Sequence, residues 1–236
     1  SATANPPSGP PPLAVTLSVG NRPRETYEFW KKCGMDRYFL RFETSDAGLF
    51  QRLHPGSSLA ERLTCLRWLK ELDVQTGSGF MIGLPGETVG ILADNILLCR
   101  NLDLDMIGIG PFIPHPDTPL GDAKNAYDDR EMFFKALSVL RVFNPYAHIP
   151  ATTAFDALFP GRGRDLCLQR GANVFMPNNT PVRHRVDYLL YPDKPGVDDD
   201  GETSGIGAVL RIEALGRTVG KGPGHSVKRK GPFLNR

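Results

Sequence analysis

The chain has 236 residues, of which 40% are hydrophobic and 23% are charged, so it can build a core of one to two domains. Its formal net charge of +2 excludes the strongly basic surface that is typical of proteins that bind nucleic acid. No apolar run reaches the ~18 residues that a membrane-spanning helix needs. We therefore expect neither nucleic acid nor a membrane as a partner.

The first segment, 1–12, contains five prolines and no large apolar side chain, and we expect it to be disordered. Beyond it, short apolar or β-branched runs alternate with segments of helical periodicity. The predicted strands lie within residues 13–19, 37–43, 74–84, 106–110, 148–153 and 173–177. The predicted helices lie within residues 25–32, 61–72, 88–101, 128–143 and 164–170.

This alternation predicts an α/β fold, in which parallel strands are joined by right-handed crossovers and covered by helices. Six such units make either an open, doubly wound sheet or part of a (β/α) barrel of the TIM type. In a barrel, the chemistry takes place at the carboxyl ends of the strands. The composition changes near residue 192, and we expect an acidic loop at 193–207, a closing helix at 206–215 and a solvated basic tail at 221–236.

The four cysteines are too far apart in sequence for a zinc or iron–sulfur motif. They are Cys33, Cys65, Cys99 and Cys167. We interpret them as buried, reduced thiols, and we expect no metal ligands in this chain. Reduced thiols are typical of an intracellular, soluble protein, in the cytoplasm or the plastid stroma.

Polar side chains follow several predicted strands. Arg41 and Glu43 share one face of a strand, because side chains repeat every two residues. Together they can bind a ligand that carries a carboxylate and hydroxyls, or they can form a structural ion pair. Thr152 and Thr153 end another strand, where their hydroxyls can bind a polar substrate or cap the next turn. No nucleophile–base motif is present, so the catalytic residues stay unknown.

Five stretches carry more specific information. They are RYFLRFETSDAGLFQRLHPGSS, GSGFMIGLPGET, DMIGIGPFIPHPDTPL, IPATTA and GANVFMPNNTPVRHR. Together they resemble the [FeFe]-hydrogenase maturase HydE family of radical S-adenosylmethionine (SAM) enzymes. Biotin synthase and methylornithine synthase share the fold and looser versions of these motifs.

The resemblance implies a partial barrel over 13–192, made of about six parallel strands that match the third to the eighth strands of the family. It implies SAM and a [4Fe–4S] cluster as cofactors, and SAM cleavage during assembly of the hydrogenase active-site cofactor. The implied substrate is a small organometallic iron complex from HydG, and the implied partners are HydG and HydF. The residues that match the SAM-binding positions of the family are Arg41, Glu43, Arg62, Met106, Pro111 and Ile113. Those that match its substrate-cavity positions are Thr152, Thr153 and Met176.

The family binds its cluster with three cysteines spaced CxxxCxxC, and this sequence has no such run. We therefore expect a C-terminal fragment of a radical SAM enzyme that is inactive alone. Three alternatives stay open. The chemistry can be that of biotin synthase or methylornithine synthase, the chain can be a non-catalytic barrel remnant that acts as a binding module, or it can be an unrelated sugar-phosphate barrel with a phosphate site at its last loops.

Overall fold

The computed structural model describes residues 13–177, 180–184 and 201–228. The segment predicted to be disordered, 1–12, lies outside these ranges, as do residues 193–200 of the predicted acidic loop. The strands are β1 (Thr16–Leu17), β2 (Arg37–Phe39), β3 (Gln75–Ile82), β4 (Met106–Pro111), β5 (Pro150–Ala151) and β6 (Val174–Phe175). The α-helices are α1 (Arg24–Lys32), α2 (Ala47–Leu53), α3 (Leu59–Glu71), α4 (Val89–Asn101), α5 (Glu131–Phe143), α6 (Thr153–Leu158), α7 (Gly163–Gln169) and α8 (Gly201–Ala214), and η1 (Val182–His184) is a 3-10 turn.

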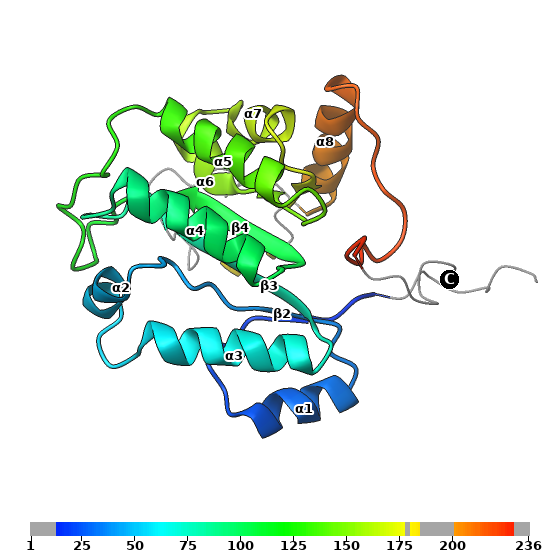
Figure 1. The fold of residues 1–236 in the computed structure, drawn as a ribbon. Helices are drawn as coiled ribbons and strands as arrows, with labels where there is room; N and C mark the ends of the chain where they lie inside the picture. The colour runs from blue at the N-terminus through cyan, green and yellow to red at the C-terminus, as the bar shows by residue number, and fades with distance from the viewer. Residues whose placement is uncertain (1–12, 178–179, 185–200, 229–236) are drawn as a thin grey trace, which may run out of the picture.

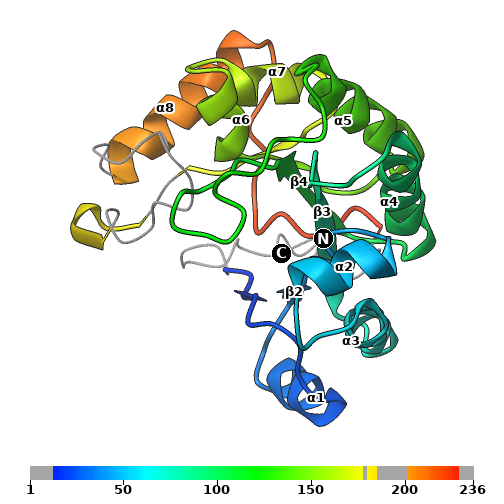
Figure 2. The ribbon, with the colours of Figure 1, turned by 90° about the vertical axis from the view of Figure 1, so that its left-hand side faces the viewer.

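The paired strands are parallel and follow one another in chain order. β1, β2, β3 and β4 form one sheet, and β5 pairs with β6. A bridge between Met106 and His148 brings the second pair alongside β4. Figure 1 shows the helices against the sheet, and Figure 2 shows them in an arc around the strands. The described strands therefore form a partial barrel that is open rather than closed, as the sequence predicts.

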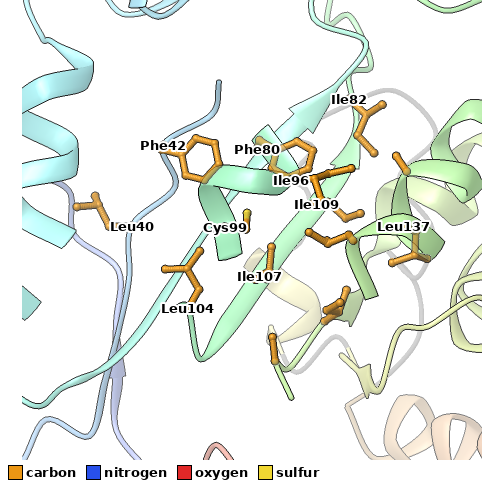
Figure 3. Close-up of a cluster of buried hydrophobic side chains, with 14 of the residues drawn as sticks. Leu40, Phe42, Phe80, Ile82, Ile96, Cys99, Leu104, Ile107, Ile109 and Leu137 are labelled. Atoms are coloured by element: carbon orange, nitrogen blue, oxygen red, sulfur yellow. The ribbon is translucent and has the colours of Figure 1, made fainter. Parts of the chain in front are cut away.

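The core lies between the strands and the helices, because alternate side chains of each strand point to the helical layer. These outward-facing side chains are Tyr38, Leu40, Phe42, Phe80, Ile82, Ile107 and Ile109, and all of them are buried. Figure 3 shows this cluster, in which the rings of Phe42 and Phe80 stack with their centroids 5.9 Å apart. The opposite, inner face of the sheet carries Arg37, Phe39, Met106 and the glycines Gly77 and Gly108.

Two short helices were missed by the sequence prediction. α2 begins after Asp46, whose carboxylate accepts a hydrogen bond from the Leu49 backbone N–H. α6 begins at Thr153, where the sequence predicts the end of a strand. Both helices have seven residues or fewer, too few for an apolar period to emerge from the sequence. The last helix, α8, begins at Gly201 and so includes part of the predicted acidic loop.

The basic tail is not a solvated end, and that prediction is wrong for its described part. This C-terminal strap, 221–228, lies across the amino-terminal end of the strands (Figure 2). Gln75 accepts a hydrogen bond from the buried backbone N–H of Ser226, 2.8 Å away. The Lys228 ammonium lies 2.7 Å from a carboxylate oxygen of Asp103. These contacts join residues more than a hundred positions apart, so local composition could not reveal them.

In the described part of the chain, no helix combines the length and the apolar character needed to cross a membrane. The cellular compartment stays a prediction.

Candidate functional site

Arg41 and Glu43 lie together on the inner face just beyond β2, as their spacing predicts. Arg41 Nε is 3.2 Å from Glu43 Oε2. The guanidinium also donates a hydrogen bond to the Phe80 carbonyl, 2.6 Å away. The ion pair lacks hydrogen-bond alignment, so Arg41 Nε and Glu43 Oε2 are buried atoms without a hydrogen-bond partner. Such atoms retain a capacity to bind a polar ligand.

The backbone at Glu43 is strained. Its φ is +64°, a left-handed value that is rare for a residue with a side chain. The Thr44 N–H donates to the Phe42 carbonyl across it, 2.8 Å away, which closes a tight turn. Bonds to β3 hold the turn, since the Glu43 N–H donates to Gly79 and the Glu43 carbonyl accepts from Met81. Strain of this kind gathers at binding sites, where the fold over-determines it.

Arg62 reaches the same place from α3. Its guanidinium donates to the Arg41 carbonyl, 2.8 Å away, and lies 5.7 Å from the centre of the Phe50 ring. Its Nε atom is also buried without a hydrogen-bond partner. The structure thus brings together Arg41, Glu43 and Arg62, three residues that the resemblance predicts to act together.

Gly77, Gly79 and Gly108 occupy the neighbouring positions of β3 and β4, where a side chain would meet atoms that are already in place. A Cβ atom added to Gly79 would meet the Gly108 carbonyl oxygen at 1.8 Å. Farther toward the amino-terminal end, the Phe39 ring covers Gly77 and Gly108, where added Cβ atoms would lie 2.6 and 2.7 Å from it. The backbone of β4 and the Phe39 ring therefore already occupy the space that side chains at these positions would need.

The other predicted residues at the carboxyl ends of the strands occupy the same edge. Pro111 ends β4 in register with Ile82, and Ile113 follows in the next loop. Thr152 Oγ1 donates to the Ile109 carbonyl, 3.3 Å away, rather than capping α6, which Thr153 begins. Met176 follows β6 and is 53% exposed. The order along this edge is therefore the one that the sequence predicts.

Met106 does not belong to this group. It begins β4 and pairs with Gly77, at the amino-terminal end of the strands. There it lines a cavity of about 350 Å³ together with Arg37, His148 and the C-terminal strap. Met106 and Pro111 lie at opposite ends of β4, because Met106 is the first residue of the strand and Pro111 the last. The assignment of Met106 to SAM binding stays a prediction.

The cysteines contribute no metal site among the described residues, which contain no group of three His, Cys, Asp or Glu side chains able to hold a metal ion. Cys65, Cys99 and Cys167 are buried free thiols, as predicted. Cys33 is exposed at the end of α1, so its predicted burial is wrong. Burial raises the pKa values of Cys99 and Cys167, which keeps these thiols protonated at neutral pH.

Sequence reasoning missed a buried carboxylate beside the site. Glu87 is 5% exposed and accepts hydrogen bonds from the Gly83 backbone N–H, at 2.6 Å, and from the Asn95 side chain, at 3.1 Å. Burial raises its pKa to about 7, although these two bonds favour the charged form. Sequence reasoning also missed Asn95, which donates one of these hydrogen bonds. The feature that could have identified it is a polar side chain on the buried face of α4, between Leu92 and Cys99.

We expect a glutamine at position 87 to reduce the pH dependence of stability. The pKa of Glu87 is higher in the folded chain than the ordinary value of 4.5, so the folded state holds the proton more tightly. This contribution is complete below about pH 4.5 and is lost as the pH rises through about 7. The loss is on the order of 1–3 kcal/mol. Urea unfolding at pH 5.5 and 8.5 should show it in the natural chain but not in Glu87→Gln.

The matched control for this experiment is Glu213→Gln, a change of the same kind at an exposed position on α8. It should retain the pH dependence of the natural chain. If Glu87→Gln and Glu213→Gln lose the same stability between the two pH values, Glu87 is not the group responsible.

No family model matches the chain, but individual proteins do. The [FeFe] hydrogenase maturase subunit HydE of Thermotoga maritima is 49% identical over 210 residues, which are 89% of this chain and 59% of that protein. Biotin synthase of Persephonella marina is 30% identical over 58% of this chain and 40% of that protein. Among solved structures, methylornithine synthase (PylB) superposes with a TM-score of 0.71 at 23% identity, over 89% of this chain and 59% of that one.

The structural likeness confirms the partial (β/α) barrel fold. The chain spans about three fifths of the length of the HydE protein that it matches. At 49% identity over 89% of its residues, it belongs to the HydE family.

Proposed function

We propose that this chain is part of a radical SAM enzyme that cleaves SAM at a [4Fe–4S] cluster while the active-site cofactor of [FeFe] hydrogenase is assembled. The HydE relative supports the maturation role by its name and its 49% identity. The observation that supports a SAM site is that three charged side chains lie together and that each has one buried atom without a hydrogen-bond partner. These atoms are Arg41 Nε, Glu43 Oε2 and Arg62 Nε.

These residues fit the polar groups of SAM. The two guanidinium groups suit its carboxylate, since arginine binds carboxylates through charge-assisted hydrogen bonds. The Glu43 carboxylate suits the ribose hydroxyls, which donate hydrogen bonds to it. We assign the adenine ring to the neighbouring strand end, where Pro111 and Ile113 match the family positions that pack on it. When bound, SAM supplies an adenosyl group, and the role of these residues is to bind and orient it.

The substrate end of the site is assigned to the far strands. Thr152, Thr153 and Met176 follow β5 and β6, and we propose that they line the cavity for a small organometallic iron complex. Two hydroxyls and a polarizable thioether suit such a ligand. The proposed source of this complex is HydG, and the proposed further partner is HydF.

The described residues do not fit a [4Fe–4S] cluster, since no three candidate ligands gather among them. We propose that these 236 residues alone neither hold the cluster nor cleave SAM, and that the cluster cysteines are supplied from outside them. Anaerobic treatment of the purified chain with iron and sulfide should leave no [4Fe–4S] absorption or magnetic-resonance signal. One cluster per chain would contradict this proposal.

Replacing Arg41 by alanine should weaken SAM binding roughly ten- to hundredfold, because a hydrogen bond to a charged group is worth about 1.5–3 kcal/mol. Calorimetric titration of the chain with SAM measures the effect. Arg37→Ala is the matched control, since Arg37 lies on the same face at the opposite end of β2. An unchanged dissociation constant in Arg41→Ala, or an equal loss in both variants, would refute the assigned role.

A second candidate is the chemistry of the wider relatives, favoured by the superposition on methylornithine synthase. The residues that follow β5 and β6 distinguish the two functions. A HydE-type site uses Thr152 and Thr153 to bind an anionic metal complex, whereas a site for an amino acid or a biotin precursor must bind an organic chain. A barrel remnant that only binds its partners would show no SAM affinity.

A further inference from the structure

Two loops that follow neighbouring strands meet at α4. One is the tight turn at Glu43, which follows β2, and the other is the loop from Gly83 to Glu87, which follows β3. Both loops contact α4, the first through the Ser45 backbone N–H and the second through the Glu87 carboxylate. A group on that helix that contacts both loops would set their relative position.

We propose that Asn95 is this positioning residue, and that it acts on the adenosyl site by tying the two loops together. The proposal rests on the proposed function, because the site in question is the one assigned to SAM. Asn95 touches neither Arg41 nor Glu43 and acts through Ser45 and Glu87.

The contacts of Asn95 are few and specific. Its side chain is fully buried. Its Oδ1 atom accepts a hydrogen bond from the Ser45 backbone N–H, 2.6 Å away, two residues beyond Glu43. Its Nδ2 atom donates to Glu87 Oε1, 3.1 Å away, and the other oxygen of Glu87 accepts from the Gly83 N–H. One amide thus links the backbone after β2 to the backbone after β3.

These two hydrogen bonds explain why an asparagine occupies position 95 on the otherwise apolar, buried face of α4. Leu92, Ile96 and Cys99 share the buried face of α4 with Asn95, and a leucine there would suit the core equally well. A leucine, however, would leave the Ser45 N–H and a Glu87 oxygen buried without this partner. The asparagine amide makes both bonds at once, because its oxygen accepts from a backbone N–H while its nitrogen donates to a carboxylate.

The Ser45–Asn95 hydrogen bond matters for the site because it lies next to the strained turn at Glu43. Glu43 holds a left-handed φ of +64°, and such a conformation persists only where surrounding contacts fix it. Bonds to β3 fix the turn on one side, and the Ser45–Asn95 bond fixes it on the other. If that bond is lost, the turn can relax and the Glu43 carboxylate moves relative to Arg41.

Hydrogen exchange of the ligand-free chain, followed by mass spectrometry or NMR, tests the link directly. In Asn95→Leu, the backbone amides of residues 43–46 and 83–87 should exchange at least tenfold faster than in the natural chain. The SAM dissociation constant should rise at least tenfold. Asn144→Leu is the matched control, since Asn144 is a buried asparagine at the end of α5 that donates only within that helix. It should leave both loops and the dissociation constant unchanged.

A second variant covers the case in which Asn95→Leu does not fold. Asn95→Asp keeps an acceptor for Ser45 and loses the donor to Glu87, so exchange should accelerate at 83–87 and not at 44–46. Unchanged exchange in both loops overturns this inference alone. A natural chain that binds no SAM overturns the SAM site proposed for Arg41, Glu43 and Arg62, and this inference with it. Faster exchange without any change in SAM affinity shows that Asn95 is structural and also overturns it.

Discussion

Replacing Gly79 by alanine should destabilise the chain by about 3 kcal/mol or more, because two backbones occupy the space that a methyl group would need. An added Cβ atom would lie 1.8 Å from the Gly108 carbonyl oxygen and 2.7 Å from its carbon. Gly79 and Gly108 are opposite each other in the pairing of β3 with β4, the longest paired stretch among the described strands. Neither strand can move aside without breaking this ladder.

Equilibrium unfolding in urea measures the effect, and two further glycines supply the controls. Gly77→Ala should cost less than Gly79→Ala, since its methyl group meets the Phe39 ring, which can shift, rather than backbone. Gly207→Ala should stabilise the chain by about 0.5–1 kcal/mol, because alanine is the better helix former and nothing lies within 4 Å of this position in α8. Equal losses at positions 77 and 79 would show that backbone crowding is not the cause.

The order of the strands could be predicted from the sequence, but their extents could not. The run 13–19 reads as one strand, yet only Thr16 and Leu17 pair with β2. Propensity describes a residue's own preference, whereas pairing depends on a neighbour that is distant in sequence. The same limit explains the strap, whose contacts with Gln75 and Asp103 no local pattern indicates.

The site could be predicted in part, for a similar reason. The Arg41–Glu43 pair was predicted from a period of two along a strand. The two side chains do meet, although β2 ends at Phe39 and Glu43 lies in a tight turn. The predicted strand 106–110 and β4 both begin at Met106, so its place at the amino-terminal end follows from the sequence, whereas its proposed role came from the resemblance alone. Asn95 and Glu87 act through contacts between a helix and two loops. Asn95 is distinguished in the sequence by its polarity on the buried face of α4, whereas Glu87 lies in the loop before that helix and has no such signal. The partners of both appear only in the fold.

Replacing Asp156 by alanine should remove about 3–5 kcal/mol of stability, because it leaves buried positive charge without its partner. Asp156 lies on α6, and its side chain is 3% exposed. One oxygen is 2.5 Å from Arg164 Nε, on α7, and 3.7 Å from Arg211, on α8. The other accepts a hydrogen bond from the Arg164 backbone N–H, 2.8 Å away. A single carboxylate therefore joins three helices.

Urea unfolding measures this loss, with Glu71→Gln as the control. Glu71 pairs with Arg24 on the surface, where exposed ion pairs contribute roughly 0–1 kcal/mol. A loss in Asp156→Ala no larger than in Glu71→Gln would contradict the prediction.

The same cluster predicts how a second change compensates the first. Arg164 also lies over the Phe175 ring at 4.4 Å, next to the end of β6 where Met176 begins the proposed substrate lining. Asp156→Ala should reduce the free energy of unfolding more when Arg164 is present than when it is replaced by leucine. A buried charge without a partner is more destabilising than an apolar side chain at the same position. The double variant Asp156→Ala, Arg164→Leu should therefore be at least about 1 kcal/mol more stable than the two single losses added together. Strict additivity would show that solvent, rather than Asp156, balances the Arg164 charge.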